Sequence, residues 1–297
     1  MTSAPPSLDE LRREIDEIDD AVHDLLMRRA EVVERVGTAK AGTVSLRPAR
    51  EALIMRRLLS RHKGPFSRAV LVRIWREILS ASVRLQGPFS VAAPTDPDGT
   101  GPDYWTVARD AFGSQTPIAD YRSAEQVVLA VKENAATVGV LPMLSEDDPA
   151  PWWPALAVPG EGMPRIIARL PFGPPGVHRG PAAEALAIAR VEQAATGDDC
   201  SFVVVETDEG VSRSRVSEGL RTVGLSTEFV ASCRGRERPD SALHIAEIHG
   251  YVGAGDQRLA DLAALGGGVR RALQIGGYAS PLSGASLADT DTASGAG

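Results

Sequence analysis

Apolar residues near the start of the chain recur in steps of three and four, which is the spacing of one face of an α-helix. Ser7 followed by Glu10 has the pattern of a capping box, so the helix is expected to begin there and to run to about Lys40. At 1.5 Å per residue it would be roughly 50 Å long. The stripe consists of Leu11, Ile15, Ile18, Val22, Leu25, Leu26, Val32, Val33 and Val36.

Two shorter helices are predicted to follow the first. One spans about residues 50–61 and the other residues 67–86, where Val70 and Ile74 are among the apolar positions. The segments "HKGPF" and "QGPF" end them, because glycine and proline interrupt helices. Two helices of this length cannot cover the long stripe of the first one. The pattern therefore predicts a three-helix module that forms an intertwined dimer.

From Ser90 onward, short β-type runs alternate with helical ones, which indicates an α/β arrangement. From Cys200 the predicted order is strand–helix–strand–strand–helix–strand, which is the split βαβ or ferredoxin-like arrangement. Four parts are expected on this basis. They are a helical domain over 1–87, an α/β lobe over 88–199, a ferredoxin-like βαββαβ domain over 200–282 and a small, polar, disordered tail over 283–297.

Two cations lie on the apolar stripe of the first helix. Arg29 follows Val22 by seven residues, and Lys40 follows Val36 by four, so both side chains point along the same face. Removing a charge from water costs several kcal/mol unless an opposite charge is nearby. The partner is therefore either a carboxylate of the protein or an anionic ligand.

Further polar residues share the apolar faces of the three helices. They are Arg12, Glu51, Ser82 and Gln86. Any one of them alone is more often a local structural feature, because long charged side chains can reach solvent. Together they describe a positively charged cavity that would suit a compact dianion carrying a hydroxyl group.

Composition narrows the possible function. The chain of 297 residues is 43% hydrophobic and 24% charged, which is typical of soluble globular proteins, and no apolar run is long enough to cross a membrane. Cys200 and Cys233 are too few for a disulfide framework, and no secretory signal is visible, so a cytoplasmic location is expected. No cluster of Lys and Arg with aromatic residues indicates nucleic-acid binding. Residues 1–87 hold 16 Lys and Arg against 12 Asp and Glu, which favours an anionic small molecule.

The helical part resembles the all-helical chorismate mutase family. The resemblance covers about residues 8–86 and rests on "LRREIDEID", "LLMRRAEVVERVGTAK", "RPAREALIMRRL" and "SASVRLQ". It implies that Arg29 and Ser82 hold the ring carboxylate of chorismate. Arg12, contributed by the other protomer, would bind the enolpyruvyl carboxylate, and Arg50 would support the anion site.

The same resemblance assigns the groups around the reacting bond. Lys40 and Gln86 would donate to the ether oxygen, and Glu51 would orient the ring hydroxyl. One departure is Arg47, at a position that can be acidic in the family. The rearrangement to prephenate is intramolecular, so the resemblance implies no cofactor and no metal. Fixed donors at the breaking C–O bond would act mainly in the transition state.

The region from about residue 91 to residue 277 resembles a prephenate dehydratase followed by an ACT domain, with large departures. The family's Thr-Arg-Phe, which includes the catalytic threonine, falls at Ala183, Glu184 and Ala185. The loop between Met143 and Arg165 is too short to build a second lobe, so no closed cleft would exclude water. We expect this region to be a truncated lobe without dehydratase activity.

The ACT-like part departs from its family as well. The effector-binding Gly-Ala-Leu reads Gly210, Val211 and Ser212, and Glu-Ser-Arg-Pro reads Ser-Cys-Arg-Gly over residues 232–235. An aromatic amino acid is the effector that the resemblance allows, but these changes disfavour regulation by phenylalanine. A scaffold that extends the dimer interface is the alternative.

Three functions remain open at this point. The first is a chorismate mutase that supplies prephenate for aromatic amino-acid biosynthesis, with a non-catalytic C-terminal region. The second is an isochorismate-pyruvate lyase on the same helical fold. The third is a regulatory subunit that turns over no chorismate. The full set of Arg, Lys, Glu, Ser and Gln side chains favours the mutase.

Overall fold

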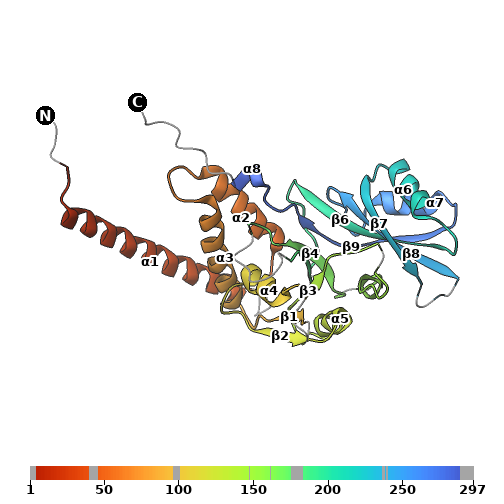
Figure 1. Ribbon diagram of the computed structural model, residues 1–297, viewed down its shortest axis with the longest axis horizontal. Helices are drawn as coiled ribbons and strands as arrows, with labels where there is room; N and C mark the ends of the chain where they lie inside the picture. The colour runs from red at the N-terminus through yellow and green to blue at the C-terminus, as the bar shows by residue number, and fades with distance from the viewer. Residues whose placement is uncertain are drawn as a thin grey trace, which may run out of the picture. The chain divides into compact units, whose positions relative to one another are not determined.

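The computed structural model describes residues 5–39, 46–95, 101–146, 148–160, 162–174, 183–235, 238 and 240–287 (Figure 1). Its contacts divide the chain into two compact units. One consists of Met1–Ser45 and Ala81–Pro88, and the other of Leu46–Ser80 and Phe89–Gly297. The second and third helices of the predicted helical domain therefore belong mostly to the same unit as the β-sheet.

Helix α1 (Leu8–Ala39) begins as predicted. The backbone N–H of Ser7 donates to the Glu10 carboxylate at 2.7 Å, and the N–H of Glu10 donates to the Ser7 hydroxyl at 3.3 Å, which completes a capping box. Lys40 lies outside the described residues. Most of the apolar stripe of α1 is exposed, at 41–64% of each side chain's surface, and only Leu26 and Val33 are half-buried. The exposed members of the stripe are Leu11, Ile15, Ile18, Val22, Leu25, Val32 and Val36.

Helices α2 (Pro48–Arg61) and α3 (Arg68–Arg84) follow. Helix α2 starts two residues earlier than predicted, because proline is well suited to the first turn of a helix. The apolar residues of α3 are not all buried. Val72, Leu79 and Val83 are buried, whereas Val70 and Ile74 are 45% and 44% exposed. Apolar residues surround much of this helix, so their spacing alone does not indicate which face is covered.

The rest of the described chain consists of a nine-stranded mixed sheet and the helices that connect its strands or follow it. The strand order in the sheet is β2-β1-β3-β5-β4-β9-β6-β8-β7. The strands are β1 (Val91–Pro94), β2 (Ile118–Tyr121), β3 (Val138–Pro142), β4 (Arg165–Leu170), β5 (Ala185–Ala189), β6 (Asp199–Asp208), β7 (Thr227–Arg234), β8 (Ser241–His249) and β9 (Val269–Ala279). The helices are α4 (Tyr104–Phe112), α5 (Ala124–Lys132), the 3-10 helix η1 (Trp153–Leu156), α6 (Arg213–Thr222), α7 (Gln257–Ala264) and α8 (Gly284–Leu287).

The two halves of the sheet differ in how their strands pair. In one half β1 is parallel to both β2 and β3, and β5 is antiparallel to β3 and β4. In the other half β6 to β9 pair only in antiparallel fashion with one another, in the predicted βαββαβ order. The halves join where β4 runs parallel to β9, at Ile166 and Gly276. Gly276 has a φ of +122°, and a Cβ there would lie 2.2 Å from the carbonyl oxygen of Ile166. The division into a lobe over 88–199 and a domain over 200–282 stays a prediction.

Alternate side chains of β6 point to opposite faces of the sheet and fill a separate core on each face. Val203 and Val205 face α6 and α7, and Phe202 and Val204 share the other core with α5 and the segment around η1. Trp152 and Trp153 are each 2% exposed, and the Trp152 ring N–H donates to the carbonyl of Pro142 at 3.1 Å. This tryptophan-rich segment is thus part of the core.

The predicted disordered tail begins with a short helix. Helix α8 starts after Ser283, whose hydroxyl accepts a hydrogen bond from the backbone N–H of Ser286 at 3.2 Å. Leu287 packs against the core of α2 and α3, which gives this segment an apolar anchor. Residues 288–297 lie outside the described residues. No helix in the described part of the chain combines the length and apolarity needed to cross a membrane.

Candidate functional site

Three of the predicted site residues meet in the first unit. The Arg29 guanidinium, on α1, donates a hydrogen bond to the hydroxyl of Ser82, on α3. Ser82 is 7% exposed, and its carbonyl accepts a hydrogen bond from the side-chain amide of Gln86 at 2.9 Å. Partial burial lowers the pKa of the Arg29 guanidinium. Residues 53 positions apart in sequence therefore form one polar cluster.

A glycine allows this cluster to form. Gly37 is buried on α1, and a Cβ at this position would lie 3.2 Å from both the Cα and the Cγ of Gln86. Such contacts are tighter than nearly all real Cβ contacts, so a larger residue would push the two segments apart. Lys40 follows Gly37 by three residues but lies outside the described residues, so its predicted role stays a prediction.

Arg12 does not join this cluster within one chain. Its side chain is 66% exposed and forms an ion pair with Asp9 at 3.4 Å on the surface of α1. Seventeen residues of helix separate Arg12 from Arg29, which corresponds to about 26 Å. An arginine side chain cannot bridge that distance. Arg12 could therefore act beside an Arg29 only if the two came from different protomers, as the sequence predicted.

Glu51 and Arg50 lie on α2 in the second unit. The Glu51 carboxylate accepts a hydrogen bond from Arg76 of α3 at 2.9 Å, and the two side chains are only 18% and 15% exposed. Burial raises the pKa of the Glu51 carboxyl, and the charge and hydrogen bond of Arg76 offset part of this rise. Arg50 and Arg47 are exposed at the start of the helix.

Sequence reasoning missed Arg76. It treated Glu51 as a carboxylate that waits for a substrate hydroxyl, whereas the structure gives it a protein partner. The signal was available in the spacing. Arg76 follows Val72 by four residues and precedes Leu79 by three, so it lies on the stripe of α3 that is buried. Arg76 was not considered from the sequence, because apolar residues lie on more than one side of α3.

In the C-terminal region, Ala183, Glu184 and Ala185, where the resemblance places the dehydratase Thr-Arg-Phe, carry no hydroxyl group. The Glu184 carboxylate forms an ion pair with Arg169 at 3.1 Å, and Ala185 is buried in β5. The described residues also contain no group of three histidine, cysteine or acidic side chains placed to hold a metal ion.

Residues 11–87 match the chorismate mutase type II family. Arg12, Arg29, Glu51, Ser82 and Gln86 all lie inside the matched segment.

Two similar proteins are both bifunctional chorismate mutase/prephenate dehydratases. The one from Stutzerimonas stutzeri is 29% identical over 148 residues, which are 48% of this chain and 40% of that protein. The one from Aquifex aeolicus is 33% identical over 142 residues, which are 46% of this chain and 38% of that protein. The chain thus spans about two fifths of the length of these relatives.

Among solved structures, the prephenate dehydratase from Streptococcus mutans is similar over 65% of this chain and 98% of its own. The sequence identity is 10% and the TM-score is 0.46.

Proposed function

We propose that the chain is a chorismate mutase, which rearranges chorismate to prephenate at a site built by its N-terminal helices. The observation that carries this proposal is the cluster of Arg29, Ser82 and Gln86. It lies in the segment that matches the chorismate mutase type II family. A half-buried arginine beside a hydroxyl and an amide is suited to binding a substrate carboxylate. The rearrangement itself needs no nucleophile or metal.

The site would act by positioning and electrostatics. Arg29 would hold the ring carboxylate together with the Ser82 hydroxyl, and the planar guanidinium fits a carboxylate through two parallel hydrogen bonds. Holding both carboxylates would select the reactive conformer, which removes an entropic part of the barrier. The amide of Gln86 and the ammonium of Lys40 would then donate to the ether oxygen as charge develops on it.

The second carboxylate would be bound by Arg12 of another copy. In support of this dimer, the stripe of α1 runs 11, 15, 18, 22, 25, 29, 32 and 36, which is the alternation of three and four typical of a helix seam. Its apolar members are exposed in the single chain. Arg29 occupies one seam position, so a partner helix would come to lie beside the polar cluster. A second copy supplies a stripe of the same length and the missing Arg12.

The C-terminal region would carry no prephenate dehydratase activity. Ala183, Glu184 and Ala185 supply no hydroxyl where the dehydratase pattern has its threonine, and Glu184 is engaged by Arg169. We further propose that an ACT-like segment over 200–282 has a structural or regulatory role. Incubation of prephenate with the protein should give no phenylpyruvate above the acid-catalysed background at matched pH. Enzyme-dependent formation of phenylpyruvate would contradict the proposed loss of activity.

Turnover of chorismate by the purified full-length chain tests the mutase activity directly. Loss of chorismate absorbance with equimolar formation of prephenate is the expected result. In this assay, salicylate and pyruvate as products of the wild-type chain would indicate the lyase, and no turnover would indicate a regulatory protein.

Substitution of Lys40 tests the donor to the ether oxygen. Lys40→Ala should lower kcat by about two orders of magnitude or more, because a donor to the developing oxyanion is removed. Lys63→Ala, in the loop between α2 and α3, is the matched control and should turn over chorismate at the wild-type rate.

A further inference from the structure

Helices α2 and α3 are fastened to the C-terminal region by specific contacts. The Arg56 guanidinium, on α2, donates to the Thr196 hydroxyl at 2.9 Å, to the carbonyl of Asp198 at 3.0 Å and to the carbonyl of Ser280 at 2.9 Å. Arg68 of α3 donates to the carbonyl of Ser286 at 3.0 Å. These bonds attach the two helices to the segment just before β6 and to the segment that follows β9.

A second attachment lies beside Glu51. The segment after β4 places the ring of Phe172 5.8 Å from the centre of the Arg76 guanidinium. The carbonyl of Phe172 accepts a hydrogen bond from the backbone N–H of Leu282 at 2.8 Å, so its position is fixed from the C-terminal side. A Cβ on Gly173 would lie 2.7 Å from the side chain of Val72, which shows how closely this segment approaches α3.

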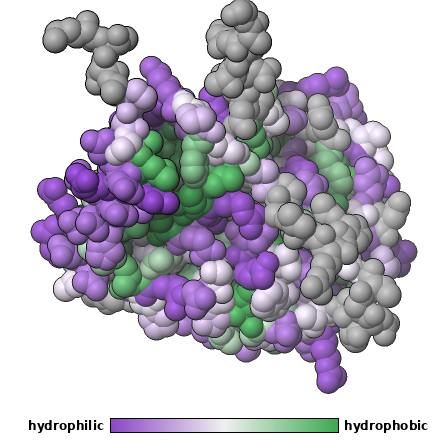
Figure 2. Space-filling model, turned by 60° about the vertical axis from the view of Figure 1, so that its left-hand side comes forward, coloured by the Kyte–Doolittle hydropathy of each residue, from purple (hydrophilic) through white to green (hydrophobic). Residues whose placement is uncertain are grey.

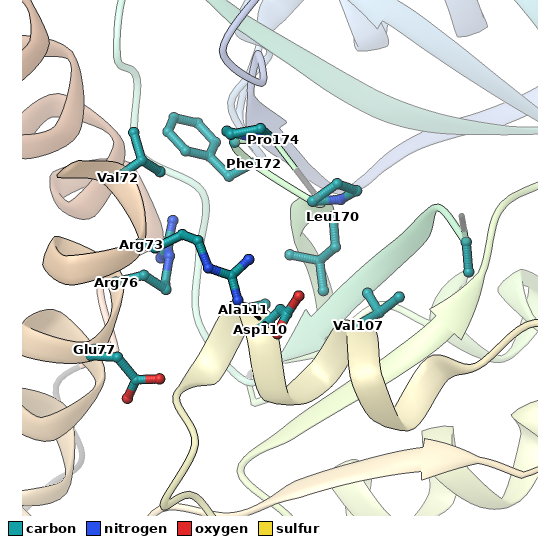
Figure 3. Close-up of a pocket in the computed structure, with 13 residues that line it drawn as sticks. Val72, Arg73, Arg76, Glu77, Val107, Asp110, Ala111, Leu170, Phe172 and Pro174 are labelled. Carbon is teal, nitrogen blue, oxygen red and sulfur yellow. Dashed lines mark hydrogen bonds and ion pairs between the residues drawn. The ribbon is translucent and has the colours of Figure 1, made fainter. Parts of the chain in front are cut away.

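The side chain of Arg76 is thus held between two groups. Figure 3 shows Arg73 and Arg76 extending from α3 toward a cavity of about 100 Å³, with Phe172 and Pro174 on one side and Asp110 of α4 on another. Arg73 pairs with Asp110 at 3.4 Å, whereas Arg76 pairs with Glu51. A guanidinium can donate to a carboxylate with its edge while its face lies near an aromatic ring.

We propose that Arg76 is a positioning residue for Glu51, and that Phe172 of the C-terminal region holds Arg76 in place. This inference rests on the proposed mutase function, in which Glu51 orients the ring hydroxyl. The C-terminal region would then contribute to mutase turnover through a chain of two contacts, without touching the substrate.

Substitution of Arg76 tests the first contact. Arg76→Gln should lower kcat/KM by about tenfold to a hundredfold, because a charge-assisted hydrogen bond to a buried carboxylate is lost. The acid limb of the pH–kcat/KM profile should also move to higher pH, since Glu51 then lacks the positive charge that opposes the effect of its burial. Arg76→Lys should restore the acid limb but only part of kcat/KM, because lysine keeps the charge without the planar face.

Arg73→Gln is the matched control for these variants. It removes an arginine one turn earlier on the same helix and at the same cavity, but Arg73 contacts Asp110 and not Glu51. Its kcat/KM and its pH profile should stay at the wild-type values. The charged neighbours of Glu51 on its own helix, Arg47 and Arg50, are unchanged in all of these variants.

Substitution of Phe172 tests the second contact. Phe172→Leu keeps an apolar side chain but removes the ring, so kcat/KM should fall about twofold to fivefold, as expected for one cation–π contact. Phe172→Tyr keeps the ring and should restore most of the activity. Equal activity in the Leu and Tyr variants would overturn the role of Phe172.

Two readouts separate this inference from the function on which it rests. If the wild-type chain does not turn over chorismate, the proposed function is wrong. The titration of the Glu51 carboxyl can still be followed by ¹³C NMR, with Glu51→Gln to assign the signal. The pH at the midpoint of this titration should rise in Arg76→Gln but not in Arg73→Gln. If the wild-type chain is active and Arg76→Gln retains the wild-type acid limb, Arg76 does not position Glu51. Circular dichroism checks that each variant is folded.

Discussion

His244 is held between two hydroxyl groups in the interior of the sheet. It is 2% exposed, its Nδ1 lies 2.7 Å from the Ser232 hydroxyl, and its Nε2 lies 3.1 Å from the Thr207 hydroxyl. The Thr207 hydroxyl donates to the carbonyl of Asp208, so it accepts from Nε2–H, and Nδ1 then accepts from Ser232. Burial, and to a smaller extent the charge of Arg213, lowers the pKa of His244 to about 4.

This burial predicts an acid-sensitive contribution to stability. The folded protein binds fewer protons than the unfolded chain between the ordinary pKa of 6.5 and the lowered value of about 4. The free energy of unfolding should therefore fall as the pH drops through this window, by about 3 kcal/mol from this residue. In His244→Gln, urea unfolding at pH 7, 5.5 and 4 should show a correspondingly weaker pH dependence. His249→Gln, at the exposed end of the same strand, is the control, and equal pH slopes in both variants would contradict the assignment.

The residue scale also shows where sequence reasoning succeeds and where it stops. Arg29 could be singled out because it interrupts a long and regular apolar stripe, and in the structure it contacts Ser82. Arg76 was missed although its spacing from Val72 and Leu79 fits a buried stripe, because its helix is apolar on more than one side. The partner of Glu51 depends on which of those sides is covered. Phe172, about a hundred positions after Arg76, and Leu282 and Leu287, about two hundred positions after it, pack against that side.

At the scale of elements, α1 is an amphipathic helix whose apolar side is exposed in the single chain. Its N-terminus was predictable because a capping box acts within four residues. The caps of α4, α5, α6 and α7 are also local, since Asp103, Ser123, Ser212 and Asp256 each accept a hydrogen bond from the first turn of their helix. Which face of a helix becomes buried depends instead on residues that are far away in the sequence. Figure 2 shows apolar surface among polar residues on one face of the molecule.

If the α1 stripe forms the dimer interface, a charge placed on it should separate the protomers. Ile18→Glu puts a carboxylate in the middle of the seam, where two copies would bury two like charges or lose their apolar contact. Light scattering coupled to size exclusion should report the mass of one chain for this variant and of two for the wild type. Asp20→Lys changes charge on the opposite side of α1 and should remain dimeric. A dimeric Ile18→Glu protein would place the interface elsewhere.

At the scale of the whole molecule, a complete site would need two chains. Arg12 and Arg29 lie on one helix but too far apart to serve one substrate. A dimer with crossed helices would instead hold two sites, each with Arg12 from one chain and Arg29 from the other. In such a dimer, two variants that are inactive alone would restore activity to each other, which a site within one chain could not do.

Arg12→Ala and Arg29→Ala should each be nearly inactive alone but complement each other when mixed. In a heterodimer one site carries both substitutions and the other carries neither. If the chains are unfolded and refolded together, about a quarter of wild-type kcat should return, because half of the dimers are mixed and each has one intact site. Two wild-type samples treated in the same way give the reference value. Activity no higher than that of the separate variants would exclude sites shared between protomers.

The join between the two halves of the sheet rests on the absence of one side chain. At Gly276, β9 runs so close to β4 that even a methyl group would meet the backbone of Ile166. Alanine at this position would divide the nine-stranded sheet into a five-stranded and a four-stranded piece. Each piece would then expose a row of unpaired amide and carbonyl groups, and such bare edges recruit strands from other molecules. A single methyl group would in this way turn a folded sheet into a source of aggregates.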